Sequence, residues 1–467
     1  MLPIRYLPAV PFLILVLFTA GAIFPWREVL GDSYYDHQRL LQSLMLVVVA
    51  MVWVFGHWRQ GLISTCRDRY LIFGFWAMMV GGAASVWLGL VPANGLVNYL
   101  HWLLLFSLFV VCAQASARGA FSTAGGLLAA QALAVFLGML YLSFALLRGD
   151  SLSPSVIYPG VDNIRFFNQI QVFVVGLLIF LLGRPRIGGW AFGLLAANLL
   201  LMALGGARGT MLVALMTLFL VGLVLPQQRP RIYRAVAALL IAGVFYFGLR
   251  SLGSQGVYPL VRPESSSFVR LSMWMEIMDV LQFHNILWGV GPGNYNQFEI
   301  IHSHPHNSIL QFLIEWGVTA LAGAALIIGR LLGLAYRHIR RYPEDELTQA
   351  LVAALVAGLG YSLVSGVIVM PVPQTLLFMF AGLVWGRVTS AKKSTTPRQT
   401  DLDRQRIEPP NSIRGWQSVL AAALVLVLTV PYMWFVSNYF LQATSSEGSS
   451  NGPGFWRNGA AFMMPER

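Results

Sequence analysis

The residues best suited to chemistry lie close together in an otherwise apolar chain, in the stretch GVGPGNYNQFEIIHSHPHNSILQFLIEWG from Gly289 to Gly317. It contains His302, His304 and His306 and runs directly into an apolar segment of helical length. Ionisable groups at the edge of a membrane bundle are costly and usually functional. This stretch is therefore predicted to hold the reactive groups of the protein.

Three interpretations of the histidines stay open from the residues alone. They can be solvated imidazoles of an interfacial loop, zinc ligands, or a general base that takes a proton from an attacking hydroxyl near pH 7. The alternating H-S-H-P-H pattern points neighbouring rings in different directions, so no metal site and no cofactor are predicted. His306 is the best-placed candidate base, because Asn307 follows it where an asparagine can cap a helix. His304, Asn307 and Glu315 are predicted to bind substrate beside it.

Several arginines fall in gaps that the apolar pattern assigns to the same side of the membrane. Arg208 lies in G-G-A-R-G-T, a tight break between two apolar runs, and Arg270 shortly precedes the histidines. Arg165 lies at the start of another apolar run. A guanidinium can pair with phosphate oxygens in a bidentate way. These arginines are predicted to clamp a diphosphate, although solvated or headgroup-contacting arginines are the alternative.

Missing motifs restrict the chemistry further. The chain has no G-x-x-x-x-G-K-[ST] phosphate loop and no dinucleotide-binding glycine pattern. It also lacks a G-x-S-x-G nucleophile elbow, and its outer gaps offer no Asp-x-Asp pair for a magnesium–nucleotide complex. A lipid diphosphate held by arginines is therefore the predicted donor.

Composition shows which elements must position these groups. The 467 residues are 57% hydrophobic and only 11% charged, whereas a soluble protein carries about 25% charged residues. The predicted fold is all-α, a polytopic membrane bundle of about 13 transmembrane helices, since about 20 apolar residues cross the hydrocarbon core. The predicted spans are 7–24, 40–58, 70–92, 97–116, 121–147, 166–183, 190–206, 210–226, 235–250, 307–329, 347–370, 372–387 and 416–437.

The net charge of +12 indicates orientation and not nucleic-acid binding. With the N-terminus in the cytoplasm, about two thirds of the basic residues fall in cytoplasmic gaps, as the positive-inside rule requires. The outer face then receives the long loop 251–306. Within that loop, Phe268 to Phe283 has the spacing of a short amphipathic helix at the membrane surface.

Four regions are predicted along the chain. Residues 1–160 form N-terminal transmembrane helices, the first of them retained and not cleaved. Residues 161–390 form a catalytic membrane domain, 388–415 a cytoplasmic linker, and 416–467 the last transmembrane helix and a periplasmic tail. The tail segment NGPGFWRNG has two interpretations, a loosely held terminus or an acceptor-docking segment.

With these motifs the chain resembles the O-antigen ligase superfamily, bacterial inner-membrane enzymes that move a glycan from undecaprenyl diphosphate onto a periplasmic acceptor. The similarity rests on G-G-A-R-G-T around Arg208, on R-x-x-x-W from Arg270 to Trp274 with the following G-V-G-P-G-N-Y, and on H-P-H-N-S-I-L-Q-F-L-I-E-W-G from His304. It covers about residues 160–390.

The resemblance implies that His306 is the essential histidine and that Arg208 and Arg270 contact the lipid diphosphate. The implied activity is a metal-independent, inverting glycosyl transfer in the bacterial inner membrane, with the active site facing the periplasm. The acceptor is a Ser/Thr hydroxyl of a protein such as type IV pilin, or lipid A–core in lipopolysaccharide assembly. A polysaccharide polymerase and a transporter of the lipid-linked glycan are the alternatives; a transporter should show charges near mid-membrane and paired discontinuous helices.

Overall fold

The computed structural model describes residues 34–57, 68–150, 152, 164–251, 265–281, 286–298, 304–394, 423, 425–438 and 455. Within these ranges every regular element is a helix, which confirms the predicted all-α class. The predicted first span 7–24, the remainder of the linker from residue 395, His302, and most of the tail lie outside the described residues.

The helices follow the predicted apolar runs closely. Among the described residues, five helical segments are long and apolar enough to cross a membrane, so the chain is a multi-pass membrane protein. These segments are Arg69–Leu88, Pro92–Ser116, Ala120–Arg148, Pro226–Ser251 and Ser308–Arg341. The total of about 13 spans stays a prediction. The elements are α3 (Tyr34–His57), α5 (Arg69–Leu88), α6 (Pro92–Arg148), α8 (Ile164–Leu181), α9 (Gly188–Leu204), α10 (Arg208–Val224), η2 (Pro226–Gln228), α11 (Arg229–Ser251), α12 (Ser265–Val280), η3 (Tyr295–Gln297), α13 (Ser308–Arg341), α14 (Glu346–Ser362) and α15 (Pro371–Ser394), followed by a helical segment Val425–Asn438.

Several boundaries differ from the sequence prediction. The span predicted over 347–370 ends early, because α14 stops at Ser362 and residues 363–370 form an irregular connector to α15. The connector is as apolar as the helix before it, so composition alone predicts that the helix continues. The chain leaves the helix because Gly366 packs against His304, so closely that a Cβ on Gly366 would lie 2.6 Å from Nε2 of His304. In addition, α6 continues through the predicted break at Arg118, and α15 extends into the predicted linker as far as Ser394.

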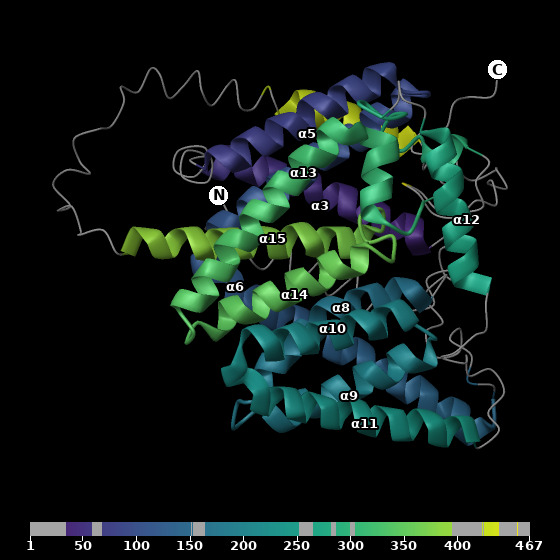
Figure 1. The fold of residues 1–467 in the computed structure, drawn as a ribbon, viewed down its shortest axis with the longest axis vertical. Coiled ribbons are helices and arrows are strands. Elements are labelled where there is room, and N and C mark those ends of the chain that lie inside the picture. The colour runs from purple at the N-terminus through teal and green to yellow at the C-terminus, as the bar shows by residue number, and fades with distance from the viewer. Residues whose placement is uncertain are drawn as a thin grey trace.

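Most of the helices lie side by side, with α5, α13 and α3 toward one end of the long axis, α9 and α11 at the other, and α14 and α15 between them (Figure 1). Small residues allow close contact between backbones in such bundles. A Cβ on Gly74 of α5 would lie 2.8 Å from the carbonyl oxygen of Gly323 of α13, and one on Gly176 of α8 would lie 2.6 Å from the backbone N of Ala354 of α14. Helix α12 stands across the ends of its neighbours (Figure 1).

A buried amide cluster connects α6, α8 and α9. Asn198 of α9 accepts hydrogen bonds through Oδ1 from Nε2 of Gln131 (2.9 Å) and Nε2 of Gln171 (3.0 Å). All three side chains are fully buried. Interhelical amide bonds of this kind stabilise membrane bundles because lipid offers no alternative partner.

Several ion pairs gather at one end of the bundle. Asp68 pairs with Arg330 at 2.6 Å, and Glu346 pairs with Arg231 at 2.7 Å. Asp345 accepts from Nη2 of Arg387 at 2.8 Å. All of these residues come from gaps or helix ends that the charge pattern assigns to the cytoplasmic side. Their pairing agrees with the predicted arrangement of the helix ends, although which side of the membrane they occupy stays a prediction.

Replacing Asp345 with asparagine is expected to destabilise this end of the bundle by about 2 kcal/mol. Burial by itself raises the pKa of the Asp345 carboxyl, but hydrogen bonds from Thr348, His338 and Arg387 outweigh burial and lower that pKa to about 2. Because this value is below the unfolded pKa of about 3.9, the contribution is present above about pH 4 and is lost as the pH falls through about 2.

The measurement is the apparent melting temperature of the purified protein at neutral pH. The matched control is Asp150→Asn, because Asp150 forms only an exposed pair with Arg148 at 3.6 Å, and such pairs contribute little. Equal melting temperatures for the two variants would contradict the assigned role of Asp345.

Candidate active site

The histidine pair stands at the start of α13. The rings of His304 and His306 lie edge to face with their centroids 4.2 Å apart, and His304 is 5% exposed. His306 has a φ of 54°, and it is the only non-glycine residue with positive φ in the part of the chain that the structure describes. A positive φ is strained for most side chains, and such strain tends to persist at functional sites.

Neighbouring groups fix this loop on three sides. Asn307 caps α13 as predicted, since its Oδ1 accepts from the backbone N–H of Ile309 (2.9 Å) and Leu310 (3.2 Å). The hydroxyl of Ser308 donates to the carbonyl of Ser362 at 2.6 Å. The indole Nε1 of Trp274 on α12 donates to the carbonyl of Pro305 at 2.8 Å.

The hydrogen bond from Trp274 to Pro305 places the R-x-x-x-W motif next to the histidine loop. Arg270 lies one helical turn before Trp274 on α12 and is partly exposed. The amphipathic helix predicted over Phe268 to Phe283 corresponds to α12, which begins and ends three residues earlier. It buries Met273 and Ile277 against the glycine-rich loop described below. The R-x-x-x-W spacing therefore positions an arginine beside the histidine loop.

The arginine at the start of α10 approaches the same region from another helix. Arg208 is exposed and is the first residue of α10. A Cβ on the adjacent Gly209 would lie 3.3 Å from the ring of Tyr361 and 3.5 Å from Val364. Val364 belongs to the connector 363–370 that also contacts His304. The Arg208 end of α10 and the histidine loop thus meet one connector.

Arg165, the third predicted arginine, lies in the first turn of α8. The position of its side chain lies outside the described part of the chain. One turn on, Gln169 donates through Nε2 to the hydroxyl of Ser365 at 3.3 Å. The start of α8 therefore approaches the same connector as α10 and the histidine loop.

A glycine-rich loop docks into a break in α13. Residue Gly317 has φ 74° and ψ 175° inside this helix, so the regular hydrogen bonds stop there. The loop supplies the missing partners: Val290 N donates to Ile314 O at 2.8 Å, Gly291 N donates to Glu315 O at 3.1 Å, and Val318 N donates to Ile286 O at 2.8 Å.

The side chain of Glu315 holds the same loop. Its carboxyl accepts hydrogen bonds from the backbone N–H groups of Gly293 and Tyr295 and from the side chain of Gln311, and it is 6% exposed. Burial raises the pKa of the Tyr295 hydroxyl. These contacts give the E-x-G part of the motif a structural task, in addition to the substrate contact predicted for Glu315.

Replacing Gly317 with alanine is expected to destabilise the protein by at least about 2 kcal/mol and to abolish activity, because an added Cβ would overlap the carbonyl oxygen of Leu287 and because φ is positive. Gly329→Ala in the same helix is the matched control, since nothing lies within 4 Å of its added Cβ. Thermal unfolding of both purified variants is the measurement. A Gly317 variant as stable as the Gly329 variant would show that the loop does not depend on this close contact.

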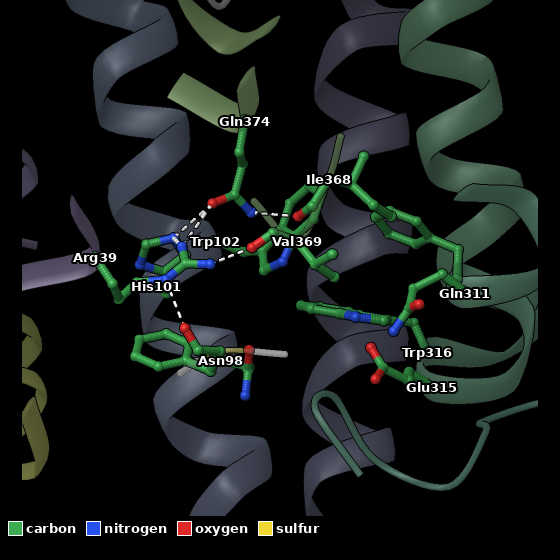
Figure 2. Close-up of a pocket in the computed structure, with 12 residues that line it drawn as sticks. Arg39, Asn98, His101, Trp102, Gln311, Glu315, Trp316, Ile368, Val369 and Gln374 are labelled. Atoms are coloured by element: carbon green, nitrogen blue, oxygen red, sulfur yellow. Dashed lines mark hydrogen bonds between the residues drawn. The ribbon is translucent and has the colours of Figure 1, made fainter. Parts of the chain in front are cut away.

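A polar cavity of about 30 Å³ lies between α3, α6, α13 and α15. Figure 2 shows Arg39, His101 and Gln374 on one side and Gln311, Glu315 and Trp316 on the other. Gln311 follows Asn307 by one helical turn, and Ile368 and Val369 of the connector complete the wall. The cavity therefore adjoins the candidate active site.

Arg39 is the central residue of this cavity, and sequence reasoning missed its role. The sequence pattern places it at the end of an outer gap, whereas α3 begins at Tyr34 and Arg39 lies inside the helix, 1% exposed. Its Nη1 donates to Gln42 Oε1 (2.5 Å) and to Gln374 Oε1 (3.1 Å). A charge at the start of an apolar run was the available signal, but Gln374, the partner from another helix, is more than 300 residues away in sequence.

Among the described residues, no group of three His, Cys, Asp or Glu side chains is placed to hold a metal ion. The candidate site instead combines the histidine pair, in which His306 has a positive φ, a helix bearing Arg270, and the start of α10 with Arg208. Such groups can hold an anion and move a proton.

Comparison with known proteins agrees with the motifs. The family model described as O-Antigen ligase matches residues 191–325, which include Arg208, Arg270 and His306. The comparison with curated proteins and the comparison with solved structures found no match. The family predicted from the motifs is confirmed for residues 191–325, which match the O-antigen ligase model.

Proposed function

We propose that this protein is a membrane glycosyltransferase that transfers a glycan from undecaprenyl diphosphate to a hydroxyl of a periplasmic acceptor. The acceptor is a Ser/Thr side chain of a protein such as type IV pilin, or lipid A–core. The O-antigen ligase domain supports a glycosyl-transferring activity of the ligase or polymerase type. The remaining support comes from the convergence of α10, α12 and the histidine loop.

The diphosphate is assigned to Arg208 and Arg270. The first turn of α10 adds backbone N–H groups that no side chain caps, and the N-terminus of a helix attracts anions. The ion pairs at the opposite end of the bundle agree with a cytoplasmic location for that end. The candidate site then faces the periplasm of a bacterial inner membrane, with Arg165 at the start of α8 as a further substrate contact.

His306 is assigned the role of general base for the acceptor hydroxyl. Its imidazole takes the proton of the acceptor hydroxyl while the hydroxyl oxygen attacks the anomeric carbon. The bond from that carbon to the diphosphate oxygen breaks, and its electron pair leaves with undecaprenyl diphosphate. The two guanidinium groups stabilise the negative charge that develops on the leaving group. A single displacement inverts the anomeric configuration and requires no metal. His304 and Asn307 position the acceptor beside His306.

A reconstitution experiment tests this function. Purified protein in lipid vesicles receives an undecaprenyl-diphosphate-linked glycan with either a pilin-like protein or lipid A–core. A transferase yields the glycosylated acceptor and free undecaprenyl diphosphate, whereas a transporter yields neither. Elongation of the glycan without an added acceptor would identify a polymerase. The same assay with EDTA tests metal independence, and loss of transfer in EDTA would refute the metal-free mechanism.

A further inference from the structure

One residue of the C-terminal tail sits directly on the buried arginine of the cavity. The backbone carbonyl of Phe455 accepts a hydrogen bond from Nε of Arg39 at 2.8 Å. The phenyl ring lies over the guanidinium, with 4.8 Å from Cζ to the ring centroid. It also meets the His101 ring edge to face at 5.3 Å. Phe455 is 6% exposed, so its side chain fills a pocket in the protein.

The guanidinium uses only neutral acceptors. Besides the Phe455 carbonyl and the two glutamines, its Nη2 donates to the Tyr35 hydroxyl at 3.2 Å and to the carbonyl of Val369. No ion pair connects Arg39 to any carboxylate in the part of the chain that the structure describes. An arginine has five N–H donors, and a buried charged donor without a partner is strongly destabilising. The Nε position therefore needs an oxygen, which the tail provides.

We propose that this pocket, defined by Arg39, His101 and Gln374, is a recognition site for a peptide segment that presents a backbone carbonyl and an aromatic side chain. The chain's own tail fills it through Phe455. Every peptide has a backbone carbonyl, so this hydrogen bond does not distinguish one peptide from another. The pocket selects a peptide by the aromatic ring that it places over the Arg39 guanidinium. A peptide from another molecule can make the same contacts once Phe455 leaves.

The ring contacts favour a peptide over a glycan as the occupant. Both the cation–π contact with Arg39 and the edge-to-face contact with His101 require an aromatic ring, which a sugar lacks. Arg39, His101 and Gln374 line the same polar cavity as Gln311 and Glu315 of α13. A peptide bound there would therefore lie beside the candidate active site.

Tethering gives the tail a strong advantage. Phe455 belongs to the same chain as its pocket, so it competes with an added peptide as an intramolecular ligand. A peptide added to the wild-type protein must therefore compete with Phe455, whereas a variant without the ring leaves the position to the added peptide. This difference provides the test.

The experiment uses the full chain and a fluorescently labelled synthetic peptide, NGPGFWRNG, which copies residues 451–459. The Phe455→Ala variant is expected to bind the peptide at least ten times more tightly than the wild type. The same peptide with alanine in place of its phenylalanine should lose this binding. The control variant Phe247→Ala removes an exposed aromatic ring of α11 and should behave as the wild type.

Equal peptide binding by the wild type and the Phe455→Ala variant would overturn the proposal. Displacement of the peptide by a neutral oligosaccharide would overturn the choice of a peptide ligand. If Phe455→Ala does not fold, a photoreactive benzoylphenylalanine at position 455 of the full chain replaces it. Its crosslink to the pocket should weaken when excess peptide is added, and an unchanged crosslink contradicts exchange. These measurements use neither donor nor acceptor, so their outcome is independent of the proposed transfer activity.

Discussion

Replacing Arg208 with alanine is expected to lower the rate of glycan transfer by about two to three orders of magnitude, with no loss of folded protein. Arg208 is exposed at the first position of α10, so its removal creates no cavity. The lost interaction is the one with the diphosphate leaving group, where negative charge builds up as the glycosidic bond breaks. The measurement is transfer by the reconstituted protein with a saturating amount of lipid-linked donor.

Two further variants define what the arginine contributes. Arg208→Lys should also be strongly impaired, because an ammonium group keeps the charge but cannot contact two phosphate oxygens in a fork. Arg250→Ala is the matched control, since Arg250 lies in the last turn of α11 on the same predicted face but belongs to no motif. This variant should transfer glycan at a rate close to the wild type. Near-full activity of Arg208→Ala would remove the diphosphate clamp from the mechanism.

Replacing His306 with asparagine is expected to lower transfer by about two to four orders of magnitude, the usual contribution of a positioned general base. Asparagine tolerates the left-handed backbone region better than most residues, so the φ of 54° can be kept. Its amide cannot take the proton of the acceptor hydroxyl. Transfer to acceptor at saturating donor is the measurement, with the melting temperature as a check on folding.

A glycine at the same position separates strain from chemistry. His306→Gly removes the imidazole and relieves the cost of a positive φ, so this variant should be at least as stable as the wild type and still inactive. A decrease of less than tenfold in both variants would mean that His306 orients the acceptor and takes no proton.

The apolar pattern was sufficient to predict most of the fold. The starts of α5, α8, α9, α10 and α13 lie within about two residues of the predicted spans, because a run of about 20 apolar residues leaves a membrane chain few alternatives. The N-cap at Asn307 was predicted for a similarly local reason. The predicted end of the span 347–370 was wrong. The helix ends early because Gly366 packs against His304, and composition does not record a contact between distant segments.

The candidate site was only partly predictable. Its motifs indicated which residues matter, and Trp274 explains why Arg270 belongs with the histidines. The pocket around Arg39 was not predictable, because Gln374 and Phe455 lie more than 300 residues away from that arginine. The use of Glu315 to hold the glycine-rich loop was hidden for a different reason, since a carboxylate in a motif indicates substrate binding as readily as backbone capping.

The break at Gly317 has a consequence for biogenesis. A transmembrane helix normally satisfies its own backbone and can be inserted as an independent unit. Here Ile314, Glu315 and Val318 depend on the preceding loop for their backbone partners, and the hydroxyl of Ser85 on α5 donates to the Glu315 carbonyl at 2.5 Å. This segment therefore reaches its final state only after an earlier helix and the loop have assembled around it, so insertion into the bilayer and tertiary folding are coupled at this point of the chain.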